Sequence, residues 1–385
     1  MLIVAYLIPA FAISARLTDI PMPQIGFGQI LSELEAIQND LGFGSYTSAL
    51  AGTEQLNLFL LTASLMFGTA GLPHVIIRFY TAKSVRAARY SALWALFFIA
   101  LLYTTAPTVA AFAKFNMLDD FNNTPAEQLP GWVDTWSDVG LITSPEGGAP
   151  TDLDGDGMLN FTGGEGNEVI INNDILVLAS PEIGGLPAPI VGLVAAGGLA
   201  AALSTASGLL LVISSSVAND VYHKRINPQA GERQQLLVAR IAMALAIVVA
   251  GYLGINPPGF AGEVVALAFG LACASFFPTL TLGIFWKKCT AMGAAAGMGA
   301  GITVTLAYMV ATLPAEASGF FLGLDPLWGI APVGFGFIGM LINFAVTIVV
   351  SSFTPKPTPV MQELVEEVRY PGRTTLVAKH AEGEL

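Results

Sequence analysis

Long runs of apolar residues constrain the fold of this chain more than any other feature of its sequence. A helix of roughly 20 apolar residues crosses a bilayer core about 30 Å thick. Because unpaired backbone polar groups are costly in lipid, such runs are predicted to form helices rather than loops or open sheets. We read full spans at Leu58–Phe79, Ser91–Phe112, Ala188–Val217, Leu236–Leu253, Val264–Trp286, Ala291–Leu313 and Ile330–Phe353. Only 11% of the residues are charged, against about 25% in a typical soluble protein, so the sequence predicts an all-α integral membrane protein.

The first residues, Met1–Ser14, are apolar, but the run is short for a span and contains Pro9. A secretory signal begins with basic residues, whereas here the basic Arg16 follows the apolar run. We therefore interpret Met1–Ser14 as the second half of a helix. On this interpretation we expect the chain to be a fragment, or to start at an internal methionine.

Basic residues gather in short segments between the apolar runs. These segments cover residues 78–89, 224–240 and 287–288, and further basic residues follow in the tail. When the runs are assigned alternately to the two directions, all of these clusters fall on one side of the bilayer. Short loops rich in Lys and Arg stay in the cytoplasm, so we predict a multi-pass protein of the cell (inner) membrane with a cytoplasmic C-terminus. Only the single charges Arg16 and Lys114 fall at the outer face.

The charge pattern also predicts the domain organisation. Residues 1–353 are expected to form a transmembrane bundle into which an acidic extracellular loop, residues 117–187, is inserted, and residues 354–385 to form a cytoplasmic tail. The loop holds thirteen acidic residues and no basic ones. Its Trp132 and Trp136 are expected either to lie at the membrane interface, where tryptophan is enriched, or to pack the loop as a lid.

The apolar run after the acidic loop is rich in small residues. Within it, Ala201, Ser204, Thr205 and Gly208 are spaced i, i+3, i+4 and i+7 and therefore share one helical face. Hydroxyl and carbonyl oxygens are the ligands that a hard cation such as sodium accepts. Small residues are also typical of closely packed membrane helices, in which Ser and Thr bond back to their own helix. The pattern alone favours close packing and leaves an ion site open.

Residues 65–78 place Gly68, Gly71 and Pro73 inside an apolar run. Proline removes a backbone donor and clashes with the preceding turn, so this helix is expected to kink or unwind. A helix broken in mid-membrane exposes backbone dipoles, which is typical of transporter binding sites. The alternative is an ordinary kink filled by neighbouring helices. His74 is a candidate ligand of a solute or a proton, with a bond to a backbone carbonyl as the equal alternative.

Two motifs carry a family resemblance. Residues 71–80 read Gly-Leu-Pro-His-Val-Ile-Ile-Arg-Phe-Tyr and precede a basic loop. Residues 200–211 read Ala-Ala-Ala-Leu-Ser-Thr-Ala-Ser-Gly-Leu-Leu-Leu, and Asn-Asp-Val-Tyr follows them. These motifs resemble the sodium:solute symporter family, most closely its bacterial branch related to acetate and other monocarboxylate permeases. The resemblance extends from Met1 to about Phe353.

The resemblance implies a leucine-transporter-like inverted-repeat fold, in which five helices are repeated upside down. Met1–Ser14 then resembles the end of core helix 5, the next five spans resemble core helices 6 to 10, and two peripheral helices follow. The resemblance also implies a sodium site between core helices 1 and 8, to which this chain contributes the Ala201 carbonyl and the hydroxyls of Ser204 and Thr205. The residues expected to line the solute cavity are Gly68, Thr69, Gly71 and His74. Because core helices 1 to 4 are absent, we expect that the polypeptide alone does not accumulate solute.

The acidic loop contains the opening of a calcium-binding loop. Oxygen-bearing side chains occupy its positions one, three, five and nine: Asp152, Asp154, Asp156 and Asn160. At position twelve, where a bidentate glutamate is expected, the chain has Gly163. A calcium site and a solvated cluster of aspartates that bond to their own backbone therefore remain equal alternatives.

The sequence thus predicts a sodium-coupled symporter of a small organic solute, with a monocarboxylate such as acetate as the candidate and this chain as its C-terminal portion. The alternative is a non-transporting membrane sensor or interaction protein with a calcium-binding outer loop. No nucleophile–base pair is evident in the spans, so an enzyme is not expected. The expected partners are the solute and the lipid bilayer, not nucleic acid, and the oligomeric state is left open. In the otherwise solvated tail, Val360–Arg369 is expected to form a short amphipathic helix.

Overall fold

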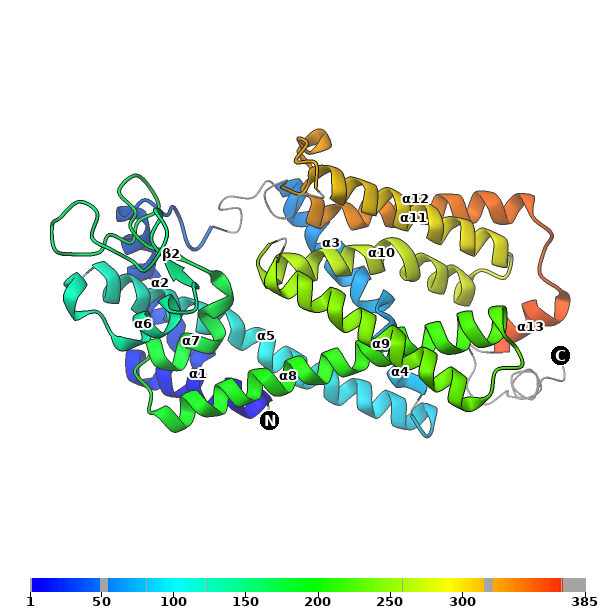
Figure 1. Cartoon of the computed structure of the whole chain (residues 1–385), viewed down its shortest axis with the longest axis horizontal. Helices are drawn as coiled ribbons and strands as arrows, with labels where there is room; N and C mark the ends of the chain where they lie inside the picture. The colour runs from blue at the N-terminus through cyan, green and yellow to red at the C-terminus, as the bar shows by residue number, and fades with distance from the viewer. Residues whose placement is uncertain are drawn as a thin grey trace. The chain divides into compact units, whose positions relative to one another are not determined.

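The computed structural model describes residues 2–48, 55–80, 82–122, 124–257, 259–314, 321–367 and 369. Nearly all regular structure in these residues is helical (Figure 1). Six helices are long and apolar enough to cross a membrane: α5 (Val85–Asn122), α8 with the π-helical segment η3 (Ala188–Ile226), α9 (Glu232–Ile255), α10 (Ala261–Phe285), α11 (Ala291–Thr312) and α12 with the turn before it (Pro332–Phe353). The prediction of an all-α membrane protein is confirmed.

The remaining described elements are shorter. The helices among them are α1 (Leu2–Thr18), α2 (Pro23–Asp40), α3 (Gln55–Gly71), α4 (Pro73–Tyr80), α6 (Gly131–Ser137), α7 (Leu176–Ile183) and α13 (Pro359–Glu367). Two short strands, β1 (Ile142–Thr143) and β2 (Ile170–Ile171), pair antiparallel. The chain forms two compact units: the first comprises Met1–Gly52 and Tyr90–Ser207, and the second comprises Thr53–Arg89 and Gly208–Leu385.

In the first unit, α1 and α2 meet at an angle of 47°. Pro23 begins α2 at the helical position where a missing N–H costs nothing. At the end of α1, the Ser14 hydroxyl donates to the Ile20 carbonyl over 2.7 Å and the Thr18 hydroxyl donates to the Ser14 carbonyl over 2.7 Å. Residues 23–40, for which the sequence analysis predicted no helix, are therefore a helix that extends α1 across a bend.

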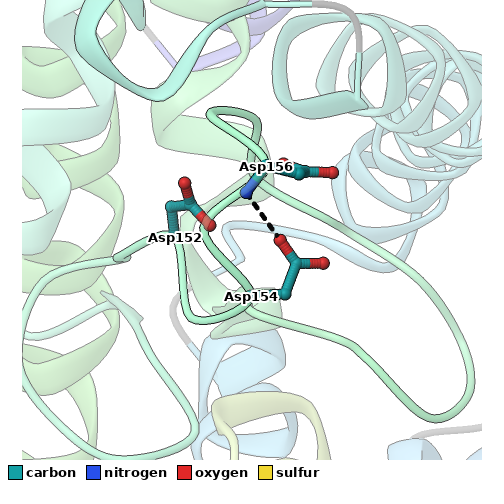
Figure 2. A group of neighbouring side chains, drawn as sticks. All are labelled: Asp152, Asp154 and Asp156. Carbon is teal, nitrogen blue, oxygen red and sulfur yellow. Dashed lines mark hydrogen bonds between the residues drawn. The ribbon is translucent and has the colours of Figure 1, made fainter.

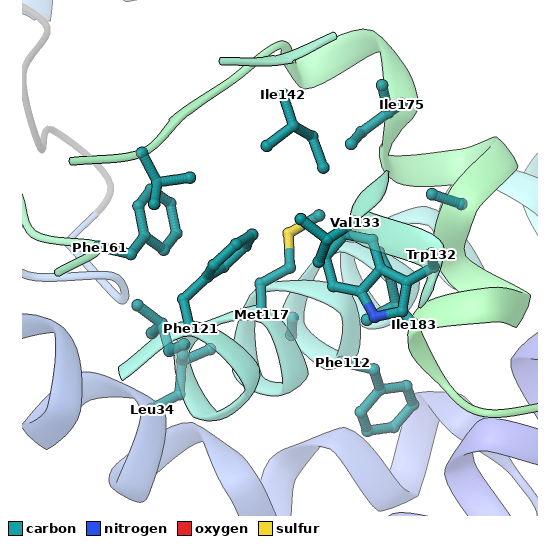
Figure 3. Close-up of a cluster of buried hydrophobic side chains, with 14 of the residues drawn as sticks. Leu34, Phe112, Met117, Phe121, Trp132, Val133, Ile142, Phe161, Ile175 and Ile183 are labelled. Atoms are coloured by element: carbon teal, nitrogen blue, oxygen red, sulfur yellow. The ribbon is translucent and has the colours of Figure 1, made fainter. Parts of the chain in front are cut away.

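The acidic segment, residues 117–187, is a packed structure rather than an open loop. Its core is formed by buried side chains from α1, α2, the last turns of α5, α6, β1 and α7 (Figure 3). Met117, Leu118 and Phe121 are each no more than 1% exposed in this core. Their burial keeps residues 117–122 helical, so α5 runs five residues beyond the expected start of the loop at Met117.

The two tryptophans of this segment pack within it, and a role of the segment as a lid stays a prediction. Trp132 is 7% exposed and meets the ring of Phe121 edge to face with the centroids 5.7 Å apart. Its indole N–H donates to Asp120 over 3.3 Å, and the indole N–H of Trp136 donates to Glu182 over 2.7 Å. Each indole thus stabilises a carboxylate as well as filling the core.

In the second unit, α3, α10, α11 and α12 pack into one bundle (Figure 1). The helix α9 packs against η3 (Ser216–Ile226). The predicted tail helix is confirmed as α13, and it is not simply solvated. Glu366 on α13 forms an ion pair with Lys287 over 2.6 Å, and the Arg369 Nε–H donates to the carbonyl of Ile284 over 2.7 Å. The tail beyond residue 369 lies outside the described residues.

Candidate functional site

The candidate sodium ligands lie on α8, which is continuous from Ala188 to Ser215. Ser204 and Thr205 are exposed and Ala201 is half-buried. Within the described residues, neither the Ser204 nor the Thr205 hydroxyl makes a hydrogen bond. Ser207 behaves differently, because its hydroxyl donates to the Ser204 carbonyl over 2.9 Å. The two hydroxyls that the family resemblance singled out are therefore not bonded back to their own helix.

The chemistry of this face suits a hard monovalent cation. Ser204 and Thr205 each offer a hydroxyl oxygen with two lone pairs. The Ala201 carbonyl lies in regular helix, and a backbone carbonyl that accepts the helical bond keeps a second lone pair for a ligand. C-terminal to this face, after Ser215, the helix changes to the π-helical segment η3. The sequence analysis did not predict this segment.

The broken helix is observed where proline predicted it, with α3 ending at Gly71 and α4 beginning at Pro73. Leu72 lies between the two helices, and its carbonyl accepts from the N–H groups of Val75 and Ile76, over 3.1 Å in each case. His74 lies half-buried in the first turn of α4. The expectation of a kink or unwinding at this point is confirmed.

The glycines beside the break have a packing role in the structure. A Cβ atom at Gly68 would meet the carbonyl of Phe269, and one at Gly71 would lie 2.6 Å from the carbonyl oxygen of Ala272. These glycines therefore let α3 approach the backbone of α10. Thr69 points to an exposed face, and its hydroxyl donates to the Leu65 carbonyl over 2.8 Å. That Gly68, Thr69, Gly71 and His74 line a solute cavity stays a prediction.

The calcium-like loop brings its three aspartates together (Figure 2). One carboxylate oxygen from each of Asp152, Asp154 and Asp156 lies within 4.8 Å of the others. Asp152 accepts from the N–H of Gly155 over 2.6 Å and from that of Gly157 over 2.8 Å. These two hydrogen bonds hold the pKa of the Asp152 carboxyl below its usual value, and the bond from Gly157 has the larger effect. The carboxylate therefore stays ionised at neutral pH, as a metal ligand must.

Of the other two loop positions, nine has the expected ligand and twelve does not. The side-chain amide of Asn160 donates to Asp154 over 3.2 Å, so Asn160 lies beside the aspartates as the spacing predicts. Gly163 at position twelve brings no carboxylate, and its N–H donates to the carbonyl of Leu41 over 2.9 Å. Glu165, two residues after position twelve, is exposed and is not part of the group of aspartates. Glu168, further along the chain, holds the loop backbone instead. Its two oxygens accept the backbone N–H groups of residues 153, 154 and 160 over 2.6–3.2 Å, and it is 2% exposed.

Sequence reasoning missed a buried polar cluster in the second unit. Asn343 on α12 is fully buried, and its amide donates to the carbonyls of Ala274 and Ser275, each over 2.8 Å. Pro278 has no N–H, so the Ala274 carbonyl lacks its helical donor and Asn343 supplies one. Thr347 in turn donates to the Asn343 side-chain oxygen over 3.0 Å. The signal available in the sequence was a proline and an asparagine in two apolar spans.

The comparisons with known proteins decide the family. The model of the sodium:solute symporter family matches residues 11–120 and 172–301. The chain belongs to the sodium:solute symporter family. The matched ranges include α8 with its candidate sodium ligands, and they leave out residues 121–171, which carry the calcium-like loop.

Two relatives agree with membership of the sodium:solute symporter family. The chain is 42% identical over 319 residues to an uncharacterized symporter of Cupriavidus necator, a match that covers 82% of this chain and 45% of that protein. It is 27% identical over 285 residues to a monocarboxylic acid transporter of Corynebacterium glutamicum, with coverage of 73% and 43%. The chain therefore matches a little under half the length of each of these symporter-family relatives.

Proposed function

We propose that this chain takes part in sodium-coupled symport of a small monocarboxylate. The single observation that carries the proposal is the exposed pair of hydroxyls at Ser204 and Thr205, unbonded to their helix, in a chain of the sodium:solute symporter family. Sodium binds these hydroxyls and the Ala201 carbonyl. The solute class rests on the relative from Corynebacterium glutamicum, a monocarboxylic acid transporter.

The family fold supports a definite assignment of the helices. In the proposal, α1 corresponds to the end of core helix 5 and α3 with α4 to core helix 6. The spans α5, α8, α9 and α10 correspond to core helices 7 to 10, and α11 and α12 are peripheral. The basic segments and the tail with α13 lie in the cytoplasm, and the acidic outer segment lies outside the cell, because short basic loops are retained on the cytoplasmic side.

Uptake of radiolabelled acetate and propionate by cells that express the full-length gene product containing this chain tests the proposal, because the 385 residues alone are not expected to accumulate solute. Ser204→Ala and Thr205→Ala each remove one ligand oxygen and are expected to raise the sodium concentration for half-maximal uptake by about tenfold, which equals about 1.4 kcal/mol of binding free energy. Ser214→Ala is the matched control, because the Ser214 hydroxyl is buried and donates to the Leu211 carbonyl of its own helix over 3.1 Å. An unchanged sodium requirement in both ligand variants contradicts the assignment.

We also propose that the outer segment binds calcium at Asp152, Asp154, Asp156 and Asn160. The proposal rests on the three carboxylates that lie within 4.8 Å of one another. Because position twelve lacks a carboxylate, the affinity is expected at the weak end for such loops, with a Kd of about 10⁻⁴–10⁻³ M. Calorimetric titration of the purified chain with calcium measures it. Asp154→Asn is expected to abolish the heat of binding and Asp138→Asn, outside the loop, to leave it unchanged. Equal binding by the two variants excludes this site.

A further inference from the structure

The first unit contains two basic side chains, Arg16 and Lys114, in its whole sequence. Arg16 has a structural role, because its guanidinium donates to the carbonyls of Gly184 and Gly185 over 2.7 and 2.9 Å. These carbonyls close the C-terminal end of α7, where the helix dipole favours a cation. Lys114 is thus the basic residue of this unit whose role the fold does not explain.

Lys114 projects from α5 into an aromatic setting. Its ammonium lies 3.8 Å from the ring centroid of Phe43 and 4.4 Å from that of Phe161. Among the described residues, no carboxylate lies within 4 Å of this ammonium. Glu35, an acidic residue on α2, has its oxygens engaged by the Thr47 N–H over 2.8 Å and by the Asn39 amide over 3.3 Å. A half-buried cation in an otherwise acidic outer segment therefore has aromatic neighbours and no counter-ion.

The side chain of Lys114 lines a cavity of about 260 Å³. This volume is near the lower end of the range of about 300–1,000 Å³ for ligand pockets, which suits a small organic molecule. Gln38, Tyr46 and Asn173 add polar groups to the wall, and Met117 and Phe161 add apolar surface. The cavity thus has one charged end and an apolar side.

Gln38 adds a second polar group that can bond to a ligand in the cavity. The residue is 6% exposed, and its side-chain amide makes no hydrogen bond to another described residue. Because Gln38 lines the cavity wall, its amide can bond to water or to a ligand held there. Burial also raises the pKa of Tyr46, so its hydroxyl stays protonated and able to donate. An ammonium, an amide and a hydroxyl are the donor set that a carboxylate accepts from.

We propose that this cavity is a binding site for a small monocarboxylate anion, held by the Lys114 ammonium and the Gln38 amide with its alkyl group against Met117 and Phe161. A single lysine balances a single negative charge, and the surrounding acidic segment disfavours dianions. The same lysine repels cations, and the apolar wall favours an anion with an alkyl group over phosphate. The solute class rests on the proposed function, but the site is separate from the sodium ligands and needs no sodium.

Binding of radiolabelled propionate to the purified chain in detergent, measured by equilibrium dialysis in sodium-free buffer, tests the site. Lys114→Gln is expected to weaken binding at least tenfold, whereas Lys114→Arg keeps the charge and retains binding within about threefold. Propionamide, the uncharged analogue, is expected not to compete with propionate. Gln38→Leu is a second variant that leaves the lysine in place and is also expected to weaken binding. Melting temperatures establish that each variant is folded.

The results separate this site from the proposed function. Propionate binding that is lost in Lys114→Gln and kept in Ser204→Ala supports the site, whether or not sodium-dependent uptake is found. Failure of sodium-dependent uptake by the full-length gene product, with intact propionate binding to this chain, refutes the proposed function and leaves the site standing. Equal binding by the wild-type chain and folded Lys114→Gln, competition by propionamide, or no saturable binding to the folded chain overturns the inference.

Discussion

Replacing Asn343 by leucine is expected to destabilise the second unit, because leucine has the branched shape of asparagine, with bulkier methyl groups, and removes all its hydrogen bonds. Asn343 makes three such bonds, to the carbonyls of Ala274 and Ser275 and from the hydroxyl of Thr347. At an average of about 0.6 kcal/mol for a side-chain bond in a membrane protein, their loss costs about 2 kcal/mol. The orphaned Ala274 carbonyl adds about 1–2 kcal/mol, so we expect a loss of about 3–4 kcal/mol in the free energy of unfolding.

The size of the carbonyl contribution can be measured with a second change at Pro278. Pro278→Ala restores an N–H that can donate to Ala274, four residues earlier in α10. In that background, Asn343→Leu is expected to cost about 1–2 kcal/mol less than it does alone, because the carbonyl keeps a partner. The measurement is unfolding of the purified chain by SDS in mixed micelles, followed by far-UV circular dichroism for the wild-type chain, the two single variants and the double variant.

The reasoning is refuted if Asn343→Leu costs the same in both backgrounds. Such a result means that the asparagine does not substitute for the helical donor that proline lacks. It is equally contradicted if Asn343→Leu leaves the free energy of unfolding unchanged, since three buried hydrogen bonds are removed.

Two further predictions concern the second unit and the outer segment. Gly297→Ala is expected to lower stability by about 1–3 kcal/mol, because a Cβ at this position would meet the Thr347 hydroxyl. Gly299, two residues away, faces open space. Gly299→Ala is therefore expected to be neutral or to stabilise the chain by up to about 1 kcal/mol. Melting temperatures in detergent compare them, and equal effects contradict the packing argument. For Asp152, the pKa is lowered in the folded loop, so its contribution to loop stability is complete above about pH 4, the usual aspartate value, and is lost as the pH falls below that value. The NMR shift of the Gly157 amide proton should follow this titration, and a midpoint at or above the usual value contradicts it.

The sequence predicted the membrane-spanning helices well because hydropathy is a local property. A run such as 291–313 needs no partner to be read as a helix, and α11 covers Ala291–Thr312. The break at Pro73 was also predictable, since proline acts on its own helix. The family followed from two short motifs, and the match of the family model over residues 11–120 and 172–301 confirms it.

The candidate sites were less accessible to sequence reasoning. The aspartates 152, 154 and 156 lie close in the chain, so their clustering could be predicted from spacing alone. Glu168 could not be placed in the same way, because it reaches back over eight to fifteen residues to hold the loop backbone. The glycines at 68 and 71 show the converse problem. Glycine in a broken helix suggested a cavity, which stays a prediction, and the close packing of each glycine against α10 was not foreseen.

By itself, the sequence determined that this chain is a helical membrane protein of the sodium:solute symporter family, because 20-residue hydropathy and short motifs are enough for both conclusions. Tertiary structure alone decided which side chains from distant segments are in contact. The bond from Asn343 to Ala274 spans 69 residues. Lys114, Phe43 and Phe161 belong to three separate segments, and the lysine contacts both rings. Such contacts depend on which faces the helices bury against one another, and no local pattern contains that information.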